Sequence, residues 1–119
     1  MRSRKPPKID SYAFGTLVLG GKTYTADLLL LPDRIFANWW RGDGHSVTAA
    51  DLELVFHTHP ELLLIGTGAN GLMDVPVLTR SAIERQGIEL VVQRTPDAVA
   101  TYNRMYDEKR LAAALHLTC

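Results

Sequence analysis

Apolar residues follow two kinds of pattern along the chain, and each predicts a different kind of strand. Leu62 to Ile65 is a continuous apolar run that leads directly into Gly66-Thr67-Gly68-Ala69-Asn70-Gly71. Such runs are typical of strands buried on both faces of a sheet. Lys22 to Leu31 instead alternates apolar and polar residues before its final leucines, which is typical of a strand with one wetter face. We therefore predict a central strand over Glu61 to Ile65 that ends at a glycine loop.

The first third of the chain predicts antiparallel strands. Gly20-Gly21 separates Phe14 to Leu19 from Lys22 to Leu31, and two glycines between such stretches indicate a β-hairpin. Pro32-Asp33 indicates a turn. A third strand is expected over Arg34 to Trp40, which is rich in aromatic and β-branched residues.

The rest of the chain predicts alternating helices and strands. Thr48 and Asp51 have the spacing of a capping box at the start of a short helix, which Pro60 ends. A second helix is expected over Val75 to Gln86, with Leu78 facing inward. The remaining elements expected are a strand over Ile88 to Gln93, a helix that Thr95-Pro96-Asp97 opens and caps, and a last strand over Arg110 to Leu117. The second half therefore has the order βαβαβ, which predicts an α/β sheet with right-handed crossover helices.

Charge is distributed unevenly, although the formal net charge is zero. The first eight residues hold four of the 13 basic side chains and no acid, so nine basic and 13 acidic side chains remain, a net charge of −4 for the rest of the chain. An acidic body argues against nucleic acid as a partner. The basic, proline-containing start predicts a disordered tail over residues 1–8, followed by a single domain over residues 9–119.

The residue types that build metal sites and membrane spans are sparse. Cys119 is the only cysteine, so there is neither a disulfide framework nor a thiolate site, and we expect a cytoplasmic location. His57 and His59 are two residues apart, which does not bring both rings to one helix face. No apolar run approaches the roughly 20 residues of a transmembrane helix. We therefore expect no metal, no cofactor and no membrane span.

The glycine loop matches the motif G-x-G-x-x-G, after a strand and before a helix, which is the setting of dinucleotide-binding loops. The match weakens beyond the loop. The next strand ends in Val92-Gln93 without the acid that binds a ribose, and Leu72-Met73 stand where a P-loop needs lysine and serine or threonine. Three interpretations stay open: a structural turn, which these departures favour, a loop that binds an anion or small ligand, and a true nucleotide site. The candidate ligand-binding residues are Gly66, Thr67, Gly68, Asn70, Gly71 and Thr95.

The predicted topology places the glycine loop beside the start of the last helix. Loops that follow neighbouring parallel strands emerge at the same sheet edge, so Thr95 should lie near Gly66 to Asn70. The amides of Gly68 to Gly71 and of the helix N-terminus would then face one small cleft, where an anion is favoured. Asp74 or Asp97 could fill this cleft from within. We therefore expect at most a weak site for a small anion.

Trp39-Trp40 is a second candidate surface. Neighbouring side chains of a strand point to opposite faces, so one tryptophan is expected in the core and the other at the surface, where it could bind a partner. Asp43 and His45 in the following loop could form an acid–base pair, although a solvated loop is favoured. We take Trp39, Trp40 and His45 as the candidate interaction surface.

An ordered set of short segments runs through residues 9–118: Tyr12-Ala13-Phe14-Gly15, Gly20, Tyr24, Asp27, Trp39-Trp40 with His45, Leu64 to Gly68, Gly87-Ile88, Thr95 with Ala98, Thr101-Tyr102-Asn103, and Arg110 followed by Ala112 to Leu115. Together they resemble a small family, long classified as a domain of unknown function. It includes the adipogenesis-associated domain-containing protein and the mitochondrial assembly factor 3 of respiratory complex I. The resemblance implies a three-layer α/β fold with a mixed central sheet and an added N-terminal β-hairpin. It implies no enzyme activity, and the eukaryotic assembly factor acts through protein partners at the inner membrane.

The sequence and the resemblance together predict a non-enzymatic protein-interaction or assembly module. The glycine loop is followed by no nucleophile, base or metal cluster, which argues against an enzyme. The alternative is a small-ligand or nucleotide-binding enzyme that uses Gly66 to Gly71 as an anion cradle. The expected partner is a protein, with a small anion as a weak ligand.

Overall fold

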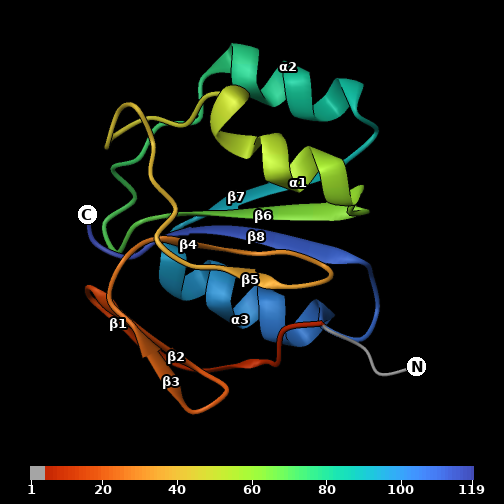
Figure 1. Ribbon diagram of the computed structural model, residues 1–119. Coiled ribbons are helices and arrows are strands. Elements are labelled where there is room, and N and C mark those ends of the chain that lie inside the picture. The colour runs from red at the N-terminus through yellow and green to blue at the C-terminus, as the bar shows by residue number, and fades with distance from the viewer. Residues whose placement is uncertain (1–4) are drawn as a thin grey trace.

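A five-stranded mixed sheet forms the middle layer of the computed structural model, which describes residues 5–119 (Figure 1). Its strand order is β5-β4-β8-β6-β7. These strands are β4 (Leu28–Leu30), β5 (Ile35–Phe36), β6 (Leu62–Thr67), β7 (Glu89–Gln93) and β8 (Leu111–His116). β6 pairs in parallel with both β7 and β8, whereas β4 is antiparallel to β8 and β5. β8, the last strand of the chain, therefore lies in the middle of the sheet.

Helices and a second sheet cover the two faces of this layer. α1 (Glu53–Thr58), which follows a 3₁₀ turn at Ala50–Leu52, and α2 (Val77–Arg85) lie on one face. α3 (Thr95–Met105) and an antiparallel sheet of β1 (Ile9–Ala13), β2 (Thr16–Leu19) and β3 (Lys22–Tyr24) lie on the other (Figure 1). The three-layer fold, the mixed sheet and the N-terminal β2–β3 hairpin are confirmed. The sequence prediction missed β1, which pairs with β2 at the edge of the small sheet.

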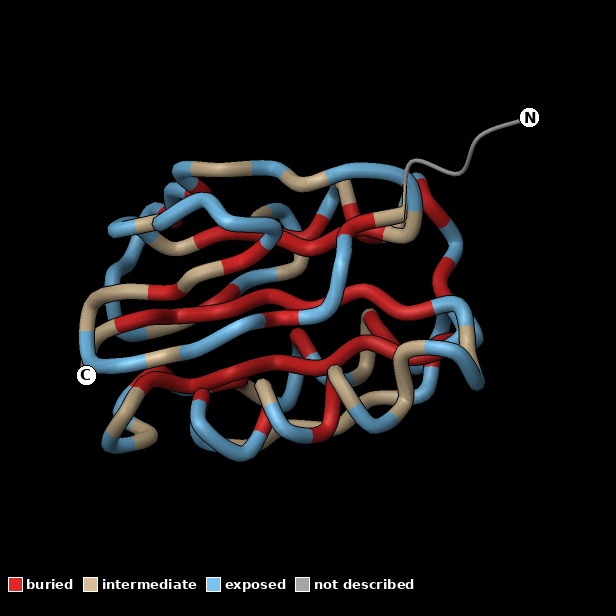
Figure 2. The backbone as a smooth tube through the Cα atoms, turned by 90° about the horizontal axis from the view of Figure 1, so that it is seen from below, coloured by how far each residue is buried: buried red, intermediate tan, exposed pale blue. Residues whose placement is uncertain are grey.

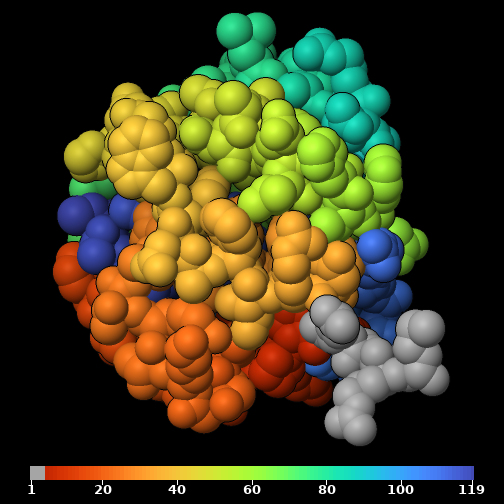
Figure 3. Space-filling view, in the orientation of Figure 1, coloured from red at the N-terminus to blue at the C-terminus, as the bar shows by residue number. Residues whose placement is uncertain are grey.

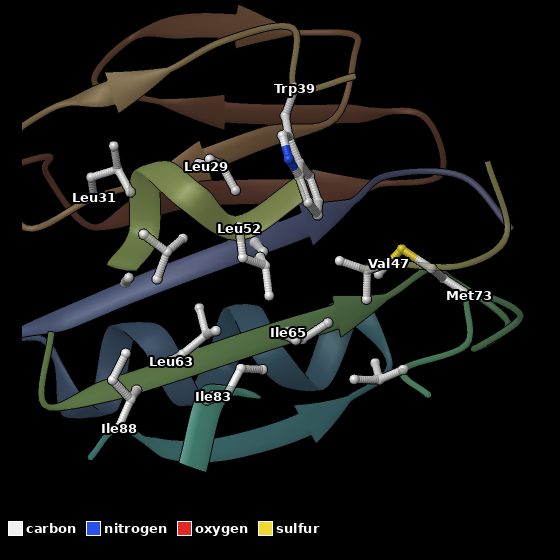
Figure 4. Packing of buried hydrophobic residues seen from close by; sticks show 14 residues of the cluster. Leu29, Leu31, Trp39, Val47, Leu52, Leu63, Ile65, Met73, Ile83 and Ile88 are labelled. Atoms are coloured by element: carbon white, nitrogen blue, oxygen red, sulfur yellow. The ribbon is translucent and has the colours of Figure 1, made fainter. Parts of the chain in front are cut away.

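Successive residues of the central strands enter two separate cores. Leu63, Ile65 and Ile83 belong to the core on the α1 and α2 side (Figure 4). Leu62 and Leu64 belong to the core on the α3 side. β6 and β8 are buried along their whole length (Figure 2). This burial on both faces explains why β6 is a continuous apolar run rather than an alternating one.

Two predicted strands are shorter in the structure. The strand expected over Lys22 to Leu31 is interrupted between β3 and β4, where Asp27 precedes the central sheet. The strand expected over Arg34 to Trp40 contains only β5, because Asn38 has a left-handed backbone with φ of 56°. The chain then turns back, and the amide of Trp39 donates to the carbonyl oxygen of Asp27 at 2.7 Å.

α2 begins two residues later than predicted, and its buried face is a different one. Leu78, expected in the core, is 83% exposed, and Val77 is also exposed. Thr79 and Ile83 face the sheet instead. The Thr79 hydroxyl donates to the carbonyl oxygen of Val47 at 2.7 Å. Because Thr79 and Ile83 form the buried face of α2, Val77 and Leu78 remain at the surface.

Residues 5–8 lie against the end of α3. Pro6 is buried, and its carbonyl oxygen accepts a hydrogen bond from the Tyr106 hydroxyl. The Lys5 ammonium lies 3.9 Å from the centre of the Tyr106 ring. The first four residues of the predicted disordered tail lie outside the described part of the chain, so disorder there stays a prediction.

Candidate functional site

The carboxyl ends of β6, β7 and β8 meet at one edge of the central sheet, on the left in Figure 1. Thr67 at the end of β6 pairs with His116 at the end of β8. Because β4 is antiparallel to β8 and Leu28 pairs with Leu115, β4 begins at the same edge. Ligands of open α/β sheets bind at this kind of edge. The glycine loop, the start of α3 and Asp27 therefore lie where a site is expected.

The predicted closeness of Thr95 to the glycine loop is confirmed. The amide of Gly68 donates to the Thr95 hydroxyl at 2.9 Å, and the amide of Thr95 donates to the carbonyl oxygen of Gly68 at 3.0 Å. The prediction that the Thr95 side chain caps α3 is wrong. Arg94 is the residue at the cap position, and the Thr95 hydroxyl donates to the carbonyl oxygen of His116 at 2.5 Å. Thr95 thus ties the glycine loop to the end of β8.

Residues 118 and 119 bind the amides of the glycine loop. The amide of Ala69 donates to the carbonyl oxygen of Thr118 at 2.6 Å. The amides of Asn70 and Leu72 donate to the oxygen of Cys119 at 3.3 and 3.0 Å. The backbone of the chain itself, rather than the carboxylate of Asp74 or Asp97, therefore occupies the donors that were expected to hold an anion.

Two glycines of the loop allow this close packing. Gly68 has φ of +105°, and a Cβ there would lie 2.2 Å from the carbonyl carbon of Cys119. A Cβ at Gly66 would lie 2.9 Å from the Thr95 hydroxyl. The Thr67 hydroxyl is also occupied, because it donates to the carbonyl oxygen of Gln93 at 3.1 Å. These contacts favour the structural-turn interpretation, and ligand binding by the loop stays a prediction.

A buried ion cluster lies at the same edge. One carboxylate oxygen of Asp27 is 2.8 Å from Nη1 of Arg41 and 2.7 Å from Nδ1 of His116. The other accepts a hydrogen bond from the amide of Leu117 at 2.8 Å. Nη2 of Arg41 donates to the carbonyl oxygen of Gly44 at 2.9 Å. The cluster therefore joins three segments: the start of β4, the loop after β5 and the end of β8.

The cluster stabilises the ionised form of Asp27. Burial acts to raise the pKa of Asp27, but hydrogen bonds from His116, Leu117 and Arg41 outweigh it, and the pKa lies below its ordinary value. Tyr12 lies nearby, and its hydroxyl donates to the carbonyl oxygen of Leu117 at 2.7 Å. Burial, and then the charge of Asp27, raise the pKa of Tyr12. Tyr12 thus stays a neutral donor beside an anion.

The sequence prediction missed the ion cluster, although two signals pointed to it. Asp27 is a charged residue directly before an apolar strand, and His116 interrupts the apolar run of β8. Neither residue indicates the other, because 89 positions separate them. Arg41, which the sequence placed in a loop, is buried, and its Nε makes no hydrogen bond with the part of the chain that the structure describes.

The two tryptophans differ as predicted. Trp39 is buried, and its indole nitrogen donates to the carbonyl oxygen of Asp51 at 2.9 Å. Its ring lies 4.8 Å from the guanidinium carbon of Arg41. Trp40 is 82% exposed. His45 is exposed as well, and its backbone amide donates to the carboxylate of Asp43 at 2.9 Å.

Large exposed apolar side chains also occur after the glycine loop and at the start of α2. The loop of Trp40 lies beside the segment after the glycine loop, because the amide of Asp74 donates to the carbonyl oxygen of His45 at 2.7 Å. This loop, drawn in yellow, stands at the surface in Figure 3. We define the tryptophan surface as Trp40, Leu72, Val77 and Leu78, which are large and exposed. Large exposed apolar groups on neighbouring segments are typical of protein-binding sites.

Metal-binding clusters and membrane-spanning helices are both absent from residues 5–119. Within this range, no group of three histidine, cysteine, aspartate or glutamate side chains could hold a metal ion. No helix in the same range is long and apolar enough to cross a membrane.

Curated relatives include proteins named as assembly factors of NADH dehydrogenase. The chain is 35% identical over 109 residues to NADH dehydrogenase [ubiquinone] 1 alpha subcomplex assembly factor 3 of Danio rerio, a match that covers 89% of this chain and 61% of the relative. It is 32% identical over 108 residues to the protein of the same name from Bos taurus, with 89% and 58% covered. The chain thus spans about three fifths of the length of these relatives.

Solved structures share the fold. A conserved hypothetical protein of Pyrococcus horikoshii has a TM-score of 0.85 and 25% identity, over 94% of this chain and 99% of that chain. An outer membrane protein of Bartonella henselae has a TM-score of 0.84 and 24% identity, over 99% and 100%, which shows a likeness of fold alone. The model of a family described as a protein of unknown function (DUF498/DUF598) matches residues 9–116, and the chain therefore belongs to this family.

Proposed function

We propose that the chain is a protein-binding module of the assembly-factor type, which binds its partner through the tryptophan surface. The observation that carries this proposal is Trp40, a large aromatic side chain that is 82% exposed. Tryptophan is enriched among the few residues that dominate binding energy in protein interfaces. Leaving it in water is unfavourable unless a partner covers it.

The residues on both sides of Trp40 hold it in place. Trp39 before it is buried and hydrogen-bonded to Asp51, and Arg41 after it is bound by Asp27. The backbone at Trp40 is therefore fixed before any partner arrives. A fixed anchor loses little conformational freedom on binding, which favours affinity.

The relatives support the kind of partner. The relatives from Danio rerio and Bos taurus carry the name of an assembly factor for NADH dehydrogenase. We extend this to the chain as part of the proposal, with a subunit of a respiratory NADH dehydrogenase as the partner and the cytoplasm as the location. The alternative, an enzyme that uses the glycine loop as an anion cradle, has less support because residues 118 and 119 bind the loop amides.

The proposal is tested by affinity purification with matched variants. Wild type, Trp40→Ala and Phe14→Ala are tagged, expressed in the cells of origin and compared by quantitative mass spectrometry. Phe14 is a suitable control because it is also an exposed aromatic residue but belongs to the turn between β1 and β2. With Trp40→Ala, the amount of NADH dehydrogenase subunit recovered should fall at least about tenfold, as expected for a dominant interface residue. With Phe14→Ala, the amount recovered should equal that with wild type. Equal enrichment by all three proteins would contradict the proposal.

A further inference from the structure

A pocket of about 270 Å³ opens at the edge of the central sheet opposite the tryptophan surface, where β8 begins. This edge lies on the right in Figure 1. Leu31, Tyr102 and Leu111, all buried residues, contribute apolar surface to the pocket. Lys109 and Arg110 contribute positive charge. We propose that this pocket binds a small carboxylate with a compact apolar body.

Arg110 lines the pocket, and its guanidinium is held at the end of α1. Its Nη2 donates to the carbonyl oxygen of Thr58 at 2.7 Å, and its Nε donates to the carbonyl oxygens of Thr58 and His59 at 3.2 and 3.3 Å. Its Nη1 makes no hydrogen bond with residues 5–119. The planar guanidinium of arginine matches the geometry of a carboxylate. A guanidinium that other hydrogen bonds already hold in place loses little conformational freedom when it binds one.

Tyr102 supplies a neutral donor inside the pocket. It is 2% exposed and packs edge-on against the ring of Tyr106, with 5.8 Å between the ring centres. Tyr102 lines the pocket, and its hydroxyl is a group that can donate a hydrogen bond to a ligand oxygen. Burial, and then the neighbouring Tyr106, raise the pKa of Tyr102 well above its ordinary value. The hydroxyl therefore keeps its proton and can donate it to a ligand oxygen.

The remaining charges limit what the pocket can hold. Lys109 lies 3.6 Å from Glu89, and both side chains are partly exposed, so this ion pair is weak and the ammonium can turn to a ligand. The Lys5 ammonium already contacts the carbonyl oxygen of Tyr106 and lies 3.9 Å from Asp107. Asp107 and Glu89, which lie near the two lysines, repel highly charged anions, whereas the apolar surface of the pocket favours a hydrocarbon body. A monocarboxylate satisfies both conditions.

The chemical class is tested by titration of the full chain with matched probes. Hexanoate and benzoate carry both the charge and the apolar body, hexanol and benzyl alcohol carry only the body, and acetate carries only the charge. Amide NMR should show saturating shifts at residues 109–111 with the first two probes in the millimolar range, and about tenfold weaker binding of the other three. Equal binding of acids and alcohols, or no saturable shift up to tens of millimolar with hexanoate and benzoate, would overturn the proposal.

Variants then test the residues. Tyr102→Phe keeps the ring and should weaken hexanoate binding about tenfold, the effect of a lost hydrogen bond to a charged group. Lys109→Gln should weaken it about threefold. Lys22→Gln, in the distant β3, is the matched control and should bind as wild type does. Unchanged binding by Tyr102→Phe and Lys109→Gln would overturn the proposal, and circular dichroism checks that each variant is folded. Trp40→Ala should bind hexanoate normally, which separates this site from the tryptophan surface.

Discussion

Asp27→Asn removes the negative charge from the buried ion cluster while nearly preserving the size of the side chain. The substitution leaves the guanidinium of Arg41, whose side chain is 4% exposed, without its counter-ion at 2.8 Å. Removing one partner of a buried ion pair costs about 3–5 kcal/mol. The Asp27 side chain is 16% exposed, so solvent screens part of the interaction. We therefore expect the free energy of unfolding to fall by about 3 kcal/mol, near the lower end of that range.

Urea unfolding followed by tryptophan fluorescence measures this loss. With a denaturant slope of roughly 2 kcal/mol per molar urea, the unfolding midpoint should fall by about 1.5 M. Asp33→Asn is the matched control, because Asp33 pairs with Arg34 at 3.1 Å but at the surface. It should change the free energy of unfolding by less than about 0.5 kcal/mol.

A double-mutant cycle with Arg41→Gln decides whether the charge pair is the cause. Once Asp27 is neutral, loss of the arginine charge should cost less, so the double variant should be at least about 1 kcal/mol more stable than the two single losses predict. The reasoning fails if the two losses simply add. It also fails if Asp27→Asn is no more destabilising than Asp33→Asn.

Four further predictions concern the same fold. Gly68→Ala should lower the free energy of unfolding by at least about 2 kcal/mol, because residue 68 has φ of +105° and a Cβ would lie 2.2 Å from the carbonyl carbon of residue 119. Gly42→Ala is the control in the same urea assay and should be nearly neutral, because a Cβ there has nothing within 4 Å. Thr95→Val should cost about 2 kcal/mol, because it leaves the amide of residue 68 without its acceptor, and a loss below about 0.5 kcal/mol would contradict the bridge. Burial acts to raise the pKa of Asp27, but hydrogen bonds hold it below the ordinary value of 3.8. The stability that ionised Asp27 contributes should therefore be complete above pH 3.8 and lost as the pH falls through the lower pKa of the folded state. Asp27→Asn should abolish this acid dependence of the unfolding free energy. Burial raises the pKa of Tyr102 from its ordinary 10.0, so stability should fall as pH rises above about 10, and Tyr102→Phe should flatten that alkaline limb.

The central layer was predictable because its strands are marked by local patterns. β6 is a continuous apolar run before glycines, and β8 is an apolar run near the end of the chain. Parallel strands with crossover helices then place the loop after β6 beside the start of α3, so the contact between Gly68 and Thr95 followed from topology alone.

Contacts between distant segments could not be read from local patterns. Arg41 and His116 are 75 positions apart and meet only because β4 pairs with β8. Leu78 is exposed because α2 turns Thr79 and Ile83 toward the sheet, and the Thr79 hydroxyl there bonds the carbonyl oxygen of Val47, 32 positions away. Likewise, nothing in the sequence of the glycine loop reveals that residues 118 and 119 occupy its amides.

The place of β8 in the sheet has a consequence for biosynthesis. β8 lies between β4 and β6, yet it leaves the ribosome after both of them. Until residues 111–116 emerge, β4 and β6 each present an unpaired backbone edge, and both are strongly apolar. The sheet therefore cannot form by successive addition of strands at its edges, and folding waits for the insertion of the central strand. Slow translation between β6 and β8 would lengthen the interval in which these edges are open to aggregation or to capture by a chaperone.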